Sequence, residues 1–144
     1  MSTLQEMLER REILILDGAI GTELESRGVP MHGVAWSAAA IETHPDVVRQ
    51  VHEDYIRAGA DIIIANTFAT SRAVLERAGM GGRVRDLNVR AVALAKEARD
   101  VASGGRDVYI AGSISTSLMP DSEGRTSSGS ALPAPRGTGK GSLP

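Results

Sequence analysis

The sequence lacks cysteine altogether, has few aromatic side chains and contains no long apolar run. The absence of cysteine excludes disulfides, thiolate zinc ligands and a cysteine nucleophile within these 144 residues. No apolar stretch approaches the ~20 residues that a membrane-spanning helix needs. Three glutamates precede the first apolar run, which is unlike the basic start of a signal peptide. We therefore expect a cytoplasmic protein that does not act in a membrane.

Charge is also nearly balanced, with a formal net charge of −2 and no block of like charges. This balance gives no electrostatic reason to expect nucleic acid as a partner. Aromatic residues make up 3% of the chain, so its core must be built from Ile, Val, Leu and Ala. The length suits a single domain of ordinary size.

What the sequence does contain is an alternation of apolar runs and amphipathic segments. The apolar runs have strand length and lack polar alternation, as is typical of strands buried on both faces: Ile13–Leu16, Asp61–Phe68 and Val108–Ile114. Helices are predicted between and before them: within residues 1–10, at Thr22–Ser26, from Pro45 to Gly59, from Ser71 to Ala78, and at Arg83–Ala102. This order predicts an α/β fold with a parallel sheet.

Each predicted strand ends in small or polar residues. Asp17 follows the first strand, Asn66-Thr67-Phe68 closes the second, and Gly112-Ser113 closes the third. Packing alone does not require these residues, although a simple strand end with local side-chain to backbone bonds would account for any one of them. Because α/β proteins bind ligands at the carboxyl ends of their strands, the three ends together favour a common polar floor.

The turn DGAIGTEL at residues 17–24 allows two interpretations. Its G-x-x-G spacing could bind a phosphate, but neither the dinucleotide nor the P-loop glycine pattern is present. A tight turn that merely needs glycine is the favoured alternative on the motif alone. The three histidines, His32, His44 and His52, form no catalytic or metal-binding pattern, and surface or capping roles are expected for them.

Residues 119–144 differ in composition from the rest. They are rich in Gly and Ser and hold four of the six prolines in the chain. No periodic apolar face is present, so we expect a disordered tail there and a folded domain over residues 1–118.

Several segments together resemble the N-terminal part of the homocysteine S-methyltransferase family, which includes betaine–homocysteine methyltransferase and the homocysteine-binding module of methionine synthase. The segments occur in order as ILDGAIGTELESRG, AWSAAAIETHPDVVRQVHEDYIRAGADIIIANTF, NVRAVALAKEARD and VYIAGSIS. The resemblance extends over roughly residues 8–118. The combination of W-S, P-x-x-x-R-Q-x-H-x-x-Y-x-x-A-G-A-D and N-T-F is far more specific than the opening turn.

The resemblance implies a (β/α)8 barrel, of which the first three βα units are present, and methyl transfer to the homocysteine thiol, giving methionine. It implies that Asp17 holds the substrate amino group. It places further residues around the substrate: Trp36, Ser37, Asn66, Thr67, Phe68, Gly112 and Ser113. In the family, a zinc ion held by three cysteines binds the homocysteine sulfur, and zinc lowers the pKa of a bound thiol.

The sequence departs from the family in having none of these cysteines. It is also short, because a full barrel takes ~250 residues and this chain has 144. The resemblance therefore suggests a truncated or frame-shifted family member that is inactive alone. Two alternatives are a non-catalytic module that completes its barrel with a partner chain, and a small α/β protein that binds a phosphate ligand at DGAIG. The methyl donor cannot be read from these residues.

Overall fold

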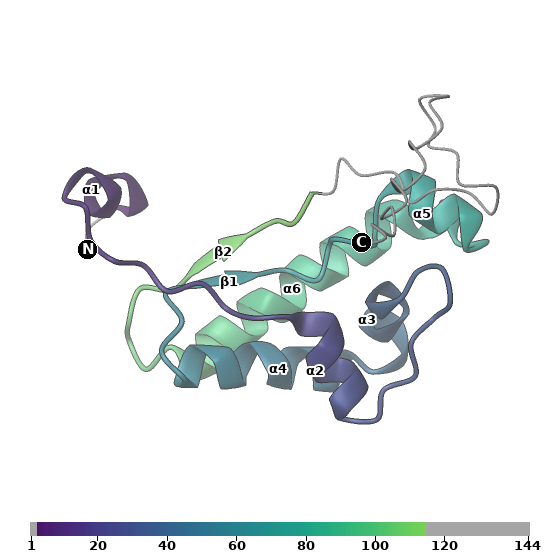
Figure 1. The fold of residues 1–144 in the computed structure, drawn as a ribbon, viewed down its shortest axis with the longest axis horizontal. Helices are drawn as coiled ribbons and strands as arrows, with labels where there is room; N and C mark the ends of the chain where they lie inside the picture. Colours follow the sequence, from purple (N-terminus) through teal and green to yellow (C-terminus); the bar gives the residue numbers. More distant parts are fainter. Residues whose placement is uncertain (1–2, 115–144) are drawn as a thin grey trace, which may run out of the picture.

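The computed structural model describes residues 3–114; residues 1–2 and the predicted tail at 119–144 lie outside this part. Along the described chain, helices outnumber strands (Figure 1). The helices are α1 (Leu4–Glu9), α2 (Ile20–Ser26), α3 (Ala40–Thr43), α4 (Pro45–Arg57), α5 (Arg72–Arg77) and α6 (Val84–Ala102), with single 3-10 turns η1 (Ser37–Ala39) and η2 (Gly81–Arg83). The strands are β1 (Ile62–Ile64) and β2 (Tyr109–Ala111). The predicted α/β class is confirmed.

The two strands are parallel, with Ile63 opposite Ile110. The predicted first strand runs beside β1 without being long enough to count as a strand of its own. Its Ile15 carbonyl accepts the amide of Asp61 at 2.8 Å, and the Asp17 amide donates to the Ile62 carbonyl at 2.9 Å. Three parallel stretches thus lie in sequence order, and their carboxyl ends meet at one edge.

Helices α4 and α6 pack against each other on one side of these strands (Figure 1). Helix α6 contributes the predicted apolar stripe to the core, with buried side chains at Leu87, Ala91, Leu94, Ala95 and Ala98. Helix α4 begins at Pro45, where a missing N–H costs nothing. After its end, Gly59 adopts a φ of 108°, which only glycine takes without strain.

On the other side of the strands, no helix within residues 3–114 covers the first stretch (Figure 1). Ile13 is 92% exposed, and Ile114, after β2, is 90% exposed. The prediction that Ile13–Leu16 is buried on both faces is therefore wrong for the described residues. A parallel sheet buries both faces only when layers cover both, and residues 3–114 supply helices mainly to one.

Helix α1, at the N-terminal end, is also left uncovered. Thr3 and Glu6 form a reciprocal capping box, which fixes the helix start, yet none of its residues is buried. No helix in the described part is long and apolar enough to cross a membrane.

The prediction that His52 lies at the surface is wrong. Its side chain is fully buried on α4. Residues 48, 52 and 56 are spaced four apart and so share one face of the helix, and Val48 and Ile56 are also fully buried.

Candidate functional site

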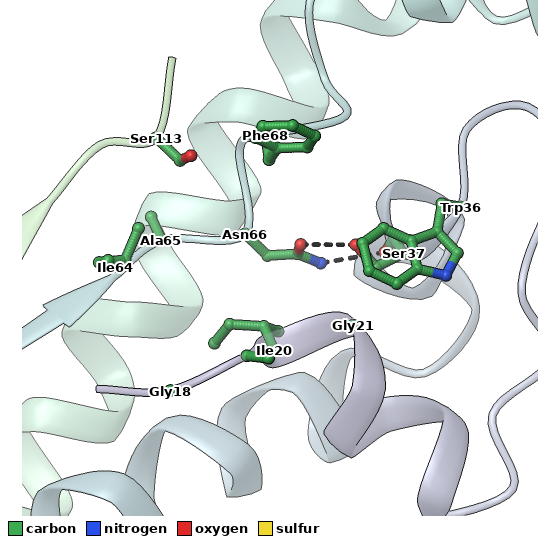
Figure 2. Close-up of a pocket in the computed structure, with 11 residues that line it drawn as sticks. Gly18, Ile20, Gly21, Trp36, Ser37, Ile64, Ala65, Asn66, Phe68 and Ser113 are labelled. Carbon is green, nitrogen blue, oxygen red and sulfur yellow. Dashed lines mark hydrogen bonds between the residues drawn. The ribbon is translucent and has the colours of Figure 1, made fainter. Parts of the chain in front are cut away.

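A cavity of about 170 Å³ opens at the edge where the three parallel stretches end (Figure 2). Its floor comes from the end of β1 and the segment after β2, and its rim from the turn after residue 17 and the loop before η1. The predicted site residues among its lining are Trp36, Ser37, Asn66, Phe68 and Ser113. These five residues therefore lie around one space, and their part in substrate binding stays a prediction.

Asn66 and Ser37 form the buried centre of this site. The Ser37 hydroxyl donates to the side-chain Oδ1 of Asn66 at 2.9 Å, and the side-chain Nδ2 of Asn66 donates to the backbone carbonyl of Ser37 at 3.0 Å (Figure 2). Both residues are almost fully buried. Because buried polar groups are costly without partners, this reciprocal pair fixes the loop against the strand end.

Trp36 lies beside this pair in an unusual backbone conformation, with φ 42° and ψ −118°. Its indole packs so closely on Gly21 that a Cβ there would lie 2.7 Å from the ring. The side chain remains 40% exposed at the cavity. Glycine is thus required at position 21 because the aromatic ring approaches so closely. A left-handed backbone is not the reason, because the φ of Gly21 is not positive.

Asp17 lies at the end of the first stretch, next to the cavity-lining Gly18. Its Oδ2 accepts the Ile64 amide at 2.8 Å. Its Oδ1 is buried and has no hydrogen-bond partner within residues 3–114. Burial raises the pKa of this carboxyl above its usual value, and hydrogen bonds from the amides of Ile64 and of Asp17 itself oppose the shift. A buried carboxylate oxygen with a free acceptor site suits a cationic partner.

Thr67 is absent from the lining of this cavity. Its hydroxyl donates to the Ser113 carbonyl and accepts the Ser113 amide, both at 2.9 Å. It therefore joins two strand ends and does not line the cavity with Trp36. It lines a second cavity of about 190 Å³ together with Thr70 and Asn88.

The geometry agrees with the comparisons with known proteins. The family model described as Homocysteine S-methyltransferase matches residues 14–131. The chain belongs to this family. It is 37% identical over 98 residues to a homocysteine S-methyltransferase of Escherichia coli, covering 67% of this chain and 32% of that protein.

A second relative and a solved structure show the same likeness. Over 116 residues the chain is 32% identical to methionine synthase of Mycobacterium tuberculosis, covering 77% of this chain and 10% of that protein. A crystal structure of the E. coli homocysteine methyltransferase MmuM, in its metallated form, superimposes with a TM-score of 0.69 at 34% identity. The superposition covers 77% of this chain and 40% of MmuM. The chain spans about a third of the length of the first curated relatives that it matches.

The zinc site that the family resemblance implies does not fit these residues. The sequence has no cysteine. Within residues 3–114, no group of three His, Cys, Asp or Glu side chains is placed to hold a metal ion. No chemical step is therefore assigned to zinc on this chain.

Sequence reasoning missed Tyr55, which shapes the turn from below. Its hydroxyl donates to the Ala19 carbonyl at 3.3 Å. A Cβ on Gly18 would lie 2.7 Å from the phenolic oxygen of Tyr55. Burial raises the pKa of this phenol, and the charges of Glu23 and Asp17 add to the effect, opposed by Arg27. The signal was available, because Tyr55 is one of only two tyrosines and falls within the family-like segment.

Proposed function

We propose that residues 3–114 form the first three βα units of a (β/α)8 barrel and bind the amino-acid end of homocysteine. The parallel order of the three stretches, the helices packed on one side and the likeness to MmuM support the partial barrel. The cavity at the carboxyl ends of the strands lies where barrels of this kind bind their substrates.

The orphaned Oδ1 of Asp17 is the observation that carries the proposal. A substrate ammonium group would supply the missing donor and offset the cost of burying the carboxylate. A phosphate ligand would instead meet the negative charge of Asp17 beside the turn, which disfavours the phosphate alternative. Trp36 and Phe68 would pack against the methylene carbons of the substrate and exclude water from the Asp17 contact.

Methyl transfer also requires an ionised thiol, and the residues that would lower the thiol pKa through a metal are not present in this chain. We therefore expect binding of homocysteine by these 144 residues without formation of methionine.

Titration calorimetry with homocysteine and with 4-mercaptobutanoate, which lacks the amino group, tests the proposal. Asp17→Asn is the matched variant, because its amide oxygen can still accept the Ile64 amide while the charge is lost. We expect the wild-type chain to prefer homocysteine by about 10-fold or more, the worth of a charge-assisted hydrogen bond, and Asp17→Asn to lose that preference.

Acidification should weaken homocysteine binding by the wild-type chain, because protonated Asp17 no longer attracts an ammonium group. Since burial raises the Asp17 pKa, this loss begins at a higher pH than for an ordinary aspartate. Equal affinity of the wild-type chain for both ligands would refute the role of Asp17. Methionine formation by the purified chain would refute the expectation of binding alone.

A further inference from the structure

The loop that carries Trp36 is closed on itself. The His32 amide donates to the Trp36 carbonyl at 3.2 Å, and the Trp36 amide donates to the His32 carbonyl at 2.8 Å. These two bonds form a narrow antiparallel bridge between residues 32 and 36. The three residues inside the bridge must turn sharply, so their own amides need acceptors from within the loop.

The His32 side chain provides that acceptor. Its Nδ1 accepts the amide of Val34 at 3.2 Å and the amide of Ala35 at 3.0 Å. Ala35 is fully buried, so its amide would be costly to leave without a partner. The imidazole must carry its proton on Nε2 for Nδ1 to accept both bonds. His32 thus acts as Asn or Asp does when its side-chain oxygen accepts a backbone amide two residues ahead.

The backbone of Trp36 shows why the loop needs this support. Trp36 has a φ of 42°, a region that residues other than glycine rarely adopt, and such a conformation persists only when its surroundings enforce it. On the C-terminal side, the pair formed by Ser37 and Asn66 supplies the constraint. On the N-terminal side, the bonds to His32 supply it. The indole is thereby directed onto Gly21, at the mouth of the cavity (Figure 2).

We propose that His32 is a positioning residue, whose Nδ1 holds the 32–36 loop closed and so fixes Trp36 as the wall of the cavity. The effect on ligand binding rests on the proposed function, whereas the effect on the indole does not. His32 itself is exposed and is absent from the cavity lining, so it acts through Trp36 and without touching the ligand.

Two substitutions separate the acceptor from the ring. His32→Phe keeps a flat ring and removes the acceptor. His32→Asn removes the ring and keeps an acceptor at the same position along the side chain. His44→Leu is the matched control, because His44 is a half-buried histidine outside the loop, and its ring bonds to neighbouring Thr43.

Trp36 is the single tryptophan of the sequence, so its fluorescence reports on this loop alone. We expect acrylamide to quench the indole about twofold more strongly in His32→Phe, with quenching in His32→Asn and His44→Leu as in the wild-type chain. Homocysteine affinity should fall about fivefold in His32→Phe, as for the loss of one net hydrogen bond, and recover in His32→Asn. Far-UV circular dichroism should be the same for all four proteins.

Wild-type quenching in His32→Phe would overturn the proposal, and so would strong quenching in both His32 variants, because the ring and not the acceptor would then matter. If His32→Phe loses its circular dichroism signal, the quenching of His32→Asn and of His32→Ser, which has a shorter acceptor, decides in its place. Acrylamide should quench the indole of His32→Ser more strongly than that of His32→Asn but less strongly than a free indole. Equal quenching in His32→Asn and His32→Ser would refute the role of the His32 acceptor. If the wild-type chain binds no homocysteine, the proposed function fails while the quenching comparison still tests His32.

Discussion

Burial of His52 should make the stability of this chain fall steeply in mild acid. The side chain is fully buried on α4, and within the described residues neither Nδ1 nor Nε2 has a hydrogen-bond partner. The neighbouring carboxylate of Glu53 is already paired with Arg49 and Arg57. Burial alone therefore lowers the pKa of His52 from 6.5 to about 4.

The direction of the effect follows from where the proton binds first. As the pH falls below 6.5, the unfolded chain protonates His52 while the folded chain does not, so the free energy of unfolding decreases. The decrease ends near pH 4, below which both states are protonated. The pKa difference of 6.5 − 4 = 2.5, at 1.36 kcal/mol for each unit, amounts to about 3 kcal/mol. Well above pH 6.5 both states are unprotonated, and the group contributes no pH dependence.

Urea unfolding followed by circular dichroism at several pH values between about 7.5 and 4.5 measures this loss. His52→Leu replaces the imidazole with an apolar side chain of similar size. His44→Leu again serves as the control, because His44 is only half-buried. All other titrating groups are common to the wild-type chain and His52→Leu, so the difference between these two proteins isolates His52. We expect that difference to widen by about 2 kcal/mol between pH 7 and pH 5 in favour of His52→Leu.

Parallel pH profiles for the wild-type chain and His52→Leu would refute this reasoning. An NMR titration of the folded protein that places the His52 imidazole at its ordinary pKa would refute it independently of any stability measurement.

Two further predictions concern the cavity and the uncovered side of the strands. Gly21→Ala should displace the Trp36 indole, because the new Cβ would lie 2.7 Å from the ring. A changed emission maximum of the single tryptophan would detect this displacement. An unchanged emission maximum would count against the packing of Trp36 on Gly21. Ile13→Lys should reduce the self-association measured by light scattering, since a 92% exposed isoleucine beside an open strand edge favours edge-to-edge contact between two copies of the chain. Equal scattering by the wild-type chain and Ile13→Lys would show that this edge does not form the contact.

Much of the helical structure could be predicted because helix periodicity is a property of the side chains themselves. The stripe of α6 and the start of α4 at Pro45 follow directly from spacing and from the chemistry of proline. His52 could have been placed correctly by the same rule, because it lies four residues from both Val48 and Ile56. Assigning polar residues to the surface outweighed the spacing and led to the error.

The strands were harder, because an apolar run shows that a strand is suited to burial and not which layers surround it. Ile13–Leu16 has the composition of a buried strand, yet the described residues leave much of it exposed. In the site, the grouping of the strand ends was predictable from the parallel order. The pair formed by Ser37 and Asn66, 29 positions apart, and the His32 bonds depend on tertiary placement that no local pattern encodes.

The contact between Gly18 and Tyr55 also bears on how this family can vary. A side chain at position 18 would collide first with the phenolic oxygen at 2.7 Å and next with ring carbons at 3.0 and 3.1 Å. Alanine at 18 is therefore compatible only with a smaller or shifted residue at 55, 37 positions further along the chain. The two positions should change together among relatives, and substitutions there should show strong pairwise epistasis, although neither would change the charge of the site.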